Sequence, residues 1–393
     1  MRRLLISAVA VLFAVSAFAQ PVHRFTVKVG IDSHSVDSLG GEANVRKQVV
    51  KMFDRINKAF NHTHRFNAVY DFVVDWDSFY IYDGLSTEEV KKPHPQHDYL
   101  VVIDGYKSDP REVGGGWYGG DILTIYHART HNDRFNDPFN NQAIDGIIHE
   151  FGHGRGMPDI YAMKVDASKN PIAPIGCYGT RCIMDYPYGE TYWSDYAVNM
   201  INLSEDKMVE IDNLVAQMCP ENLAFNVVGP DGKPVRGASL SFYPVGWYSY
   251  SVSPDAIHTV KADASGKAYF KAETIFPKSD DFGLKYPNMF VKAEHDGKVA
   301  YAWLPLYEIE MVTFAGKDTY TLDISLKDTK PSNPFDFKVD KTQFYPSPAE
   351  NEVPRWDINA QGAITWNVHP SDCPHADHIE MAGECSPGGR FSS

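Results

Sequence analysis

Long apolar segments and basic residues are both scarce in this sequence. Beyond residue 19, no segment approaches the roughly 20 consecutive apolar residues that a membrane-spanning helix needs, so we expect no membrane span in the processed chain. Acidic residues outnumber basic residues by 51 to 37, which gives a formal net charge of −14. This balance argues against nucleic acid or an anionic membrane as a partner.

Cysteine is scarce as well. The 393 residues contain five, all in the second half: Cys177, Cys182, Cys219, Cys373 and Cys385. In an oxidising compartment, the short spacings favour one disulfide between Cys177 and Cys182 and another between Cys373 and Cys385. Cys219 would then remain unpaired.

Residues 1–19 have the features of a secretory signal peptide. Arg2 and Arg3 supply a positive start, residues 4–18 form a short apolar stretch, and Ala17-Phe18-Ala19 provides a small-x-small cleavage site. We therefore expect a mature chain that begins near Gln20 and is exported, as a secreted, periplasmic or cell-surface protein. Without Arg2 and Arg3 the chain has 35 basic and 51 acidic residues, a net charge of −16.

Apolar periodicity predicts an α+β region over residues 20–220. Residues 25–31 alternate as in a β-strand, whereas the apolar residues of 42–60 recur with the period of a helix. The same criteria predict further strands at 66–76, 99–104 and 121–126, and further helices at 141–153 and within 205–218. We therefore expect a sheet with three main helices.

The character of the sequence changes near residues 219–222. From 221 to 330, short apolar alternations are separated by turn sequences such as Gly229-Pro230-Asp231-Gly232, a pattern typical of an all-β sandwich. Aromatic residues in this part either bind a sugar or a partner or pack in the core: Phe242, Tyr243, Trp247, Tyr248 and Tyr250. Residues 331–393 are rich in Pro, Ser, Asp and Gly, so we expect a loosely ordered tail.

Residue types that bind metals gather at the end of the second predicted helix. His149 and His153 are four residues apart, so both imidazoles project from the side opposite the apolar stripe and can reach a single Zn²⁺. Glu150 would stand beside a water molecule on that ion. Gly156 allows the chain to turn back after the helix through a positive φ. Asp159 then provides a third ligand and leaves the fourth zinc position open.

The string from His149 to Asp159 resembles the extended zinc signature of the metzincin clan of metallopeptidases, HExxHxxGxxH/D, in the Asp variant of the snapalysin-type peptidases. The resemblance implies that His149, His153 and Asp159 are the zinc ligands. It also implies that Glu150 is the general base and that Gly156 forms the turn. The implied fold is a mixed twisted sheet with three main helices.

Clan members also have a tight turn with a methionine beneath the zinc. The segment Cys182-Ile183-Met184-Asp185-Tyr186 resembles this turn, which identifies Met184 as the expected apolar floor of the site. Tyr186 matches the position of a tyrosine that lies beside the metal in several clan families and would stabilise an oxyanion. The strand predicted at 121–126 takes the place of the edge strand that binds extended substrate in the clan, although an ordinary strand fits equally well.

The resemblance implies a secreted zinc-dependent endopeptidase that acts on proteins, peptides or glycoproteins. Residues 221–330 resemble the immunoglobulin-like or prealbumin-like modules appended to secreted hydrolases. Two alternatives remain open: an adhesion or glycan-binding protein with a degenerate peptidase-like domain, and a zinc amidase that acts on cell-wall or glycoprotein substrates. No cysteine precedes Cys177, which excludes an N-terminal cysteine switch. In the tail, Cys373, His375 and His378 offer zinc-ligand chemistry for latency.

Overall fold

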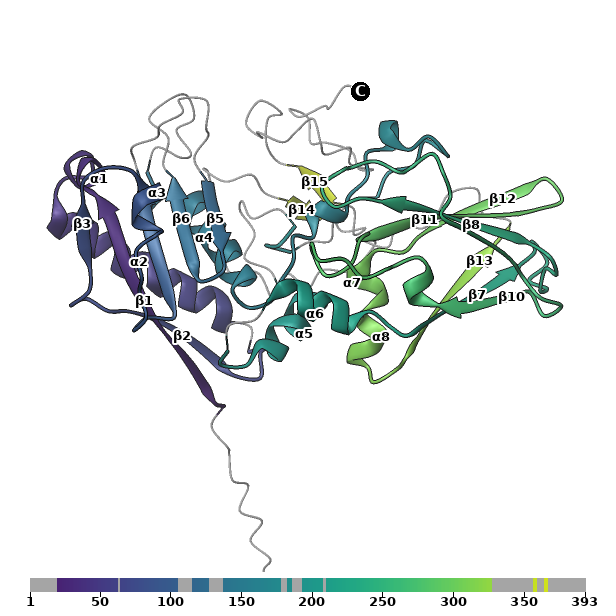
Figure 1. The fold of residues 1–393 in the computed structure, drawn as a ribbon, viewed down its shortest axis with the longest axis horizontal. Helices are drawn as coiled ribbons and strands as arrows, with labels where there is room; N and C mark the ends of the chain where they lie inside the picture. Colours follow the sequence, from purple (N-terminus) through teal and green to yellow (C-terminus); the bar gives the residue numbers. More distant parts are fainter. Residues whose placement is uncertain are drawn as a thin grey trace, which may run out of the picture.

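The computed structural model describes residues 20–62, 64–104, 115–126, 137–177, 182–185, 193–207, 210–326, 356–358 and 364–366. Within these residues, the fold is mixed α/β with several β-sheets (Figure 1). We call residues 20–218 the first region and residues 222–326 the second region.

The first region is built on a mixed, mostly parallel sheet. Its strands are β1 (Val22–Asp32), β2 (Val69–Val74), β3 (Tyr80–Tyr82), β4 (Tyr99–Asp104), β5 (Gly115–Gly119) and β6 (Ile122–Tyr126). They run in the order β2-β1-β4-β6-β5, and β3 also pairs with β1. Only β5 and β6 pair antiparallel. The central strand β4 is buried along its whole length, as expected for a parallel strand covered on both faces.

Two long helices, α2 (Glu42–Asn61) and α4 (Asn141–His153), contact each other and the sheet. Both match helices predicted from the sequence. Phe151 of α4 packs against Phe53 of α2 and Phe72 of β2, with ring centroids 6.1 and 4.6 Å away. One face of α4 is therefore held in the core, which leaves the opposite face for a site.

Polar contacts fix where α4 begins and how it lies on α2. The side chain of Asn140 accepts the backbone N–H of Ala143 at 2.9 Å and caps the helix. Buried Arg55 of α2 donates to Asp145 and, at 2.5 Å, to Asn141 of α4. Removing one partner of a buried ion pair costs about 3–5 kcal/mol, so these bonds strongly favour a single packing of the two helices.

The remaining helices of the first region are shorter. They are α1 (Ser33–Ser38), α3 (Ser86–Glu89), the 3₁₀ turns η2 (Tyr161–Met163) and η3 (Ala167–Lys169), α5 (Asp195–Ser204) and α6 (Ile211–Met218). The helix predicted within 205–218 corresponds to α6, whereas α5 was not predicted. Glu205, at φ +50°, ends α5. Figure 1 shows α5 and α6 between the two sheet-bearing parts of the molecule.

The second region contains two sheets. Its elements are β7 (Asn222–Val228), β8 (Ser239–Val245), β9 (His258–Lys261), β10 (Lys267–Lys271), η4 (Ala272–Thr274), β11 (Asn288–His295), β12 (Lys298–Trp303), α7 (Leu306–Ile309), α8 (Met311–Phe314) and β13 (Thr319–Ser325). One sheet has the order β10-β7-β13 and the other β12-β11-β8-β9. Phe225 of β7 meets Phe242 of β8 at 5.1 Å between ring centroids, so the two sheets are in contact.

The predicted ends of the chain are mostly outside the described residues. The signal peptide predicted at 1–19 lies there, and within the predicted tail at 331–393 the structure describes only β14 (Trp356–Ile358) and β15 (Ile364–Trp366), which pair antiparallel. Among the described helices, none combines the length and apolar character that crossing a membrane requires.

Of the two readings of the strand predicted at 121–126, the ordinary sheet strand is confirmed and the edge strand is wrong. These residues form β6, which lies between β4 and β5, and the antiparallel edge strand is β5. Three of the five residues of β5 are glycine. Such a segment lacks the apolar alternation that identifies strands in a sequence, which is why the edge was assigned to β6, the strand that follows β5 in the chain.

The two regions share one buried apolar core. Helix α6 ends and β7 begins on either side of the predicted boundary at 219–222, yet polar contacts cross between the regions. The amide of Asn288 donates to the carbonyl of Met163 at 3.0 Å, and the hydroxyl of Tyr196 donates to Glu310 at 2.7 Å. The two regions are therefore in direct contact.

Glu310 gives this interface a pH dependence. Its Oε2 accepts the Tyr196 hydroxyl, its Oε1 has no hydrogen-bond partner among the described residues, and burial raises the pKa of Glu310 well above its usual value. A carboxyl with a raised folded-state pKa costs stability as pH rises above its pKa in the unfolded chain. We therefore expect Glu310→Gln to raise the melting temperature at pH 8 and to change it little at pH 4, measured with EDTA present.

Two further variants control this prediction. Glu310→Ala leaves the Tyr196 hydroxyl unpaired and should lower the free energy of unfolding by about 1–3 kcal/mol at pH 4. Glu273→Gln changes an exposed carboxyl and should have no effect at either pH. An equal effect of Glu310→Gln at both pH values would contradict the prediction.

Candidate metal centre

Helix α4 presents His149, Glu150 and His153 to one cleft. The two imidazole rings lie 4.7 Å apart between centroids and stand at 85° to each other. His149 is 4% exposed and Glu150 is 8% exposed, so the site is largely shielded from water. The i, i+4 spacing brings the two rings together as the sequence predicts.

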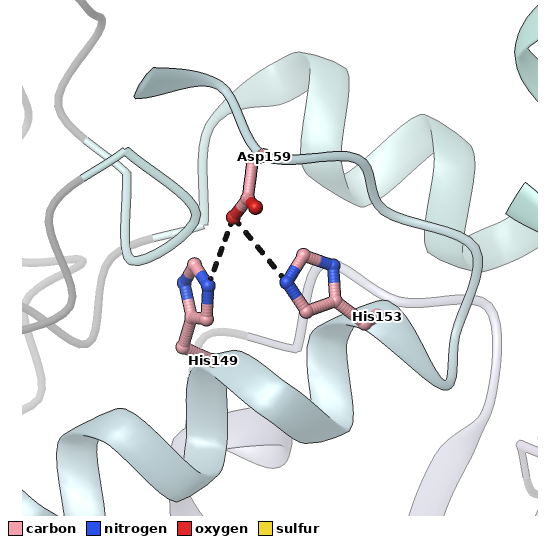
Figure 2. Close-up of side chains that lie close together, drawn as sticks. All are labelled: His149, His153 and Asp159. Atoms are coloured by element: carbon pink, nitrogen blue, oxygen red, sulfur yellow. Dashed lines mark ion pairs between the residues drawn. The ribbon is translucent and has the colours of Figure 1, made fainter. Parts of the chain in front are cut away.

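The turn after α4 brings Asp159 back over the helix. Gly156 has φ +87°, and its N–H donates to the carbonyl of His153 at 2.9 Å. The N–H of Met157 donates to the carbonyl of Gly152 at 3.2 Å, which closes the helix end. Figure 2 shows the Asp159 carboxylate facing both imidazoles. The positive φ predicted for Gly156 is thus observed.

Backbone carbonyls orient both imidazoles. Nδ1 of His149 lies 2.7 Å from the carbonyl oxygen of Ile183, and Nδ1 of His153 lies 2.6 Å from that of Met157. Because a carbonyl oxygen only accepts, each Nδ1 must carry the proton. Each Nε2 then faces away from the backbone and toward Asp159, which is the orientation that metal-binding histidines require.

The three side chains fit a metal cation. Their ligand atoms all lie within 4.8 Å of one another. Oδ1 of Asp159 is 3.0 Å from Nε2 of His149 and 3.3 Å from Nε2 of His153, but it is buried and no described donor is aligned to form a hydrogen bond with it. A buried carboxylate oxygen in this position is satisfied by a cation. The cluster of His149, His153 and Asp159 could therefore hold a metal ion.

The charge of Asp159 controls protonation in the cleft. Burial alone would raise the pKa of Asp159, but the facing imidazoles of His153 and His149 outweigh burial and hold this pKa well below its usual value. Burial would lower the pKa of His153, yet the Asp159 carboxylate raises it to about 9. Burial also raises the pKa of Glu150. Asp159 thus attracts positive charge, whereas Glu150 holds a proton more readily than an exposed glutamate.

Met184 lies beneath α4. It is fully buried, and its sulfur occupies the space that a Cβ on Gly152 would need. The carbonyl of Met184 accepts the N–H of Ile160 at 2.9 Å, which ties this turn to the segment that carries Asp159. Met184 is therefore buried against α4, and its role as the apolar floor of the site stays a prediction. Tyr186, its predicted neighbour in the site, lies outside the described residues.

The predicted disulfide between Cys177 and Cys182 is wrong. Both are free thiols, as is Cys219. The sulfur of Cys177 accepts the amide of Asn288 at 3.4 Å, and that of Cys182 accepts the N–H of Met184 at 3.5 Å. Each thiol therefore has a hydrogen-bond partner of its own. Burial raises the pKa of both, to about 11 for Cys182, so neither is a reactive thiolate.

Both regions form the cleft around the metal-binding cluster. The cleft has a volume of about 460 Å³ and is lined by His149, Glu150, His153, Pro158, Asp159, Tyr161, Ile211, Asp212, Val215, Trp247, Tyr248 and Phe282. Among the aromatic residues noted in the sequence, Trp247 and Tyr248 line the cleft, whereas Phe242 is buried in the core. Core packing is thus confirmed for Phe242, whereas binding of a sugar or a partner by Trp247 and Tyr248 stays a prediction.

Sequence reasoning did not identify two tyrosines of the cleft as parts of the site. The ring of Tyr161 stacks on His149 at 6.2 Å between centroids, and the hydroxyl of Tyr248 donates to Oδ2 of Asp159 at 2.6 Å. Tyr161 follows Asp159 by two residues, so its position in the sequence could have identified it as part of the site. Tyr248 is 89 residues from Asp159, so only the fold brings them together.

Other residues with a predicted role fall outside the described part of the chain. These are Tyr186, Cys373, Cys385, His375 and His378. Their proposed contributions to oxyanion binding, disulfide formation and latency remain predictions.

Comparison with known proteins assigns no family. No family model and no curated protein matches the sequence. A chain in a chaperone–substrate complex is similar over 47% of this chain and 35% of that chain, at 13% identity and a TM-score of 0.29. An intradiol ring-cleavage dioxygenase from Tetranychus urticae is similar over 29% and 83%, at 15% identity and 0.18. A shaft pilin from Lactobacillus rhamnosus GG is similar over 37% and 61%, at 13% identity and 0.19.

This chain thus spans about a third of the first of those structures. Similarity at this level carries no conclusion about activity. The chemistry of the cleft must therefore be argued from its own residues.

We expect the protein to bind one divalent metal ion at His149, His153 and Asp159. Asp159→Asn and His149→Ala should each lower the affinity for that ion by more than about 100-fold, because even residues that only support ligands contribute 10- to 100-fold. Metal content after refilling and dialysis, measured by atomic emission, checks this expectation.

The chain offers a matched control in a second His–Asp contact. Oδ2 of Asp75 lies 2.9 Å from Nε2 of His97, and no third ligand joins them among the residues that the structure describes. Asp75→Asn should leave the metal content unchanged. Equal metal content in Asp159→Asn and the unaltered protein would show that the metal is bound elsewhere.

Proposed function

We propose that the protein is a zinc-dependent endopeptidase. One observation supports this most directly: two imidazole nitrogens, one carboxylate oxygen and the carboxyl of Glu150 meet in a single cleft. Three protein ligands leave one position of a tetrahedral zinc open for chemistry, whereas structural zinc sites use four. The cleft is open to the outside and large enough for part of a peptide chain.

The donor set favours zinc among the common metals. Imidazole nitrogen suits zinc, copper, iron and nickel, whereas calcium and magnesium prefer sites made of oxygen alone. When bound, zinc supplies a Lewis acid that polarises a carbonyl group and lowers the pKa of water toward about 7. His149, His153 and Asp159 would hold it, with the imidazoles oriented by the carbonyls of Ile183 and Met157.

Glu150 moves the proton in the proposed reaction. Its carboxylate accepts a proton from the attacking water and later delivers it to the amine that leaves when the peptide bond breaks. Burial raises the pKa of Glu150, which brings it nearer to neutral pH, where a general base and acid works best. Tyr186, two residues after Met184 in the sequence, is proposed to stabilise the oxyanion.

The proposal also covers the second region and the N-terminal residues of the chain. The contact between the two sheets of the second region supports a β-sandwich of the immunoglobulin-like or prealbumin-like kind. Residues 1–19 support export, with the protein acting outside the cytoplasm on protein, peptide or glycoprotein substrates.

We expect Glu150→Gln to lower kcat for peptide hydrolysis by about 10²- to 10⁴-fold. The substitution keeps the size of the side chain and none of the zinc ligands changes, so zinc content should stay at one ion per chain. Cleavage of casein and of a fluorogenic peptide, with zinc content measured on the same samples, checks both expectations.

Controls separate this function from its alternatives. Glu294→Gln, an exposed carboxyl on β11, should cleave as the unaltered protein does. If both the unaltered protein and Glu150→Gln bind zinc but neither cleaves peptides, the adhesion or glycan-binding alternative would be favoured. Cleavage of peptidoglycan or glycoprotein side chains, with proteins left intact, would favour the amidase.

A further inference from the structure

One wall of the metal cleft comes from the second region. Trp247 and Tyr248 follow β8, and Phe282 lies in the loop before β11. They face a cleft whose opposite side carries the metal ligands of α4. The cleft is therefore shared between two parts of the chain.

The hydroxyl of Tyr248 holds Asp159. It donates to Oδ2 of the carboxylate at 2.6 Å, while Oδ1 faces the two imidazoles. The backbone N–H of Tyr248 in turn donates to the carbonyl of Ala162 at 3.1 Å. The phenol thus fixes which oxygen of Asp159 points to the metal position, because the other oxygen is already occupied.

Backbone strain is concentrated at this wall. Of the six described non-glycine residues with positive φ, three are aromatic and lie at or near the wall: Tyr248 at +55°, Tyr250 at +53° and Phe282 at +59°. Bulky residues rarely adopt this conformation, and each instance costs about 1–3 kcal/mol. Strain that is kept at a cleft points to a function for the side chains it positions.

The loop that carries Phe282 is docked on α6. A Cβ on Gly283, at φ +71°, would collide with the backbone of Asp212, so the loop can approach α6 this closely only with glycine. The position of Phe282 relative to α6 is therefore fixed.

The wall offers aromatic surface to a ligand. The rings of Trp247 and Phe282 stack at 5.1 Å between centroids, and the indole N–H of Trp247 is used by the carbonyl of Leu284 at 2.8 Å. Tyr248 is 40% exposed and Phe282 is 41% exposed. Exposed aromatic rings inside a cleft indicate a place where a partner buries apolar surface.

The charge of the residues that line the cleft also favours some substrate side chains over others. Ile211 and Val215 of α6 add apolar surface, and Asp212 is the charged residue beside them. Among the described residues that line the cleft there is no lysine or arginine to pair with an acidic group. An acidic side chain would therefore lose its hydration without gaining a partner.

We propose that the second region completes the active site. Tyr248 is a positioning residue for the ligand Asp159, and Trp247 with Phe282 forms the subsite for a large apolar side chain of the substrate. This inference rests on the proposed peptidase function and adds the class of substrate residue and the contribution of the second region.

The first test measures zinc affinity, which does not depend on turnover. Tyr248→Phe should raise the dissociation constant for zinc by about 10- to 100-fold in competition with a chromogenic chelator. Tyr269→Phe, an exposed tyrosine on β10, should bind zinc normally. Unchanged zinc affinity in Tyr248→Phe, or an equal loss in Tyr269→Phe, would overturn the positioning role.

The second test measures peptide binding in the Glu150→Gln background, so no cleavage interferes. Fluorescence anisotropy compares two labelled octapeptides that differ only in one central residue, Phe or Asp. The Phe peptide should bind at least about tenfold more tightly. Phe282→Ala should remove most of this difference, and Phe282→Leu should keep part of it.

Equal binding of both peptides, or an unchanged preference in Phe282→Ala, would overturn the subsite. Failure of the proposed function looks different: in that case the unaltered protein cleaves no peptide bond, whatever the zinc and anisotropy results. The two failures are thus told apart in one set of samples.

Discussion

The site depends on the position of the Asp159 carboxylate. Two imidazoles face this carboxylate on one side, and a phenol hydroxyl binds it on the other. The negative charge of Asp159 favours a cation in the space beside His149 and His153. The hydroxyl of Tyr248 sets the orientation of the carboxylate. The turn at Gly156 brings it there, and the contact of Ile160 with Met184 keeps the turn in place. Apolar packing of α4 supplies the fixed base beneath these polar contacts.

Much of this site could be predicted because its signals are local. Two histidines one helical turn apart, a glycine that permits a positive φ and a carboxylate three residues later lie within eleven residues. Helix α4 itself was predicted with its observed ends, since its apolar stripe lies in the sequence. The coarse pattern of sheet and helices followed from the same periodicities.

The remainder depends on contacts that no local pattern encodes. Tyr248 reaches Asp159 through the packing of two regions, and β5 forms an edge from a glycine-rich segment without alternation. The spacing of Cys177 and Cys182 suggested a disulfide, but the chain places their sulfur atoms with separate partners. Spacing in sequence limits which groups can meet, whereas the fold decides which of them do.

The distance along the chain between Asp159 and Tyr248 also has a consequence for biosynthesis. A ribosome that adds 5–20 residues per second needs roughly 4–18 s to make the 89 residues between them. During that interval the ligand segment has already been polymerised, whereas its phenol partner has not. The nascent polypeptide therefore cannot assemble the finished cleft until translation has passed the loop that carries Phe282.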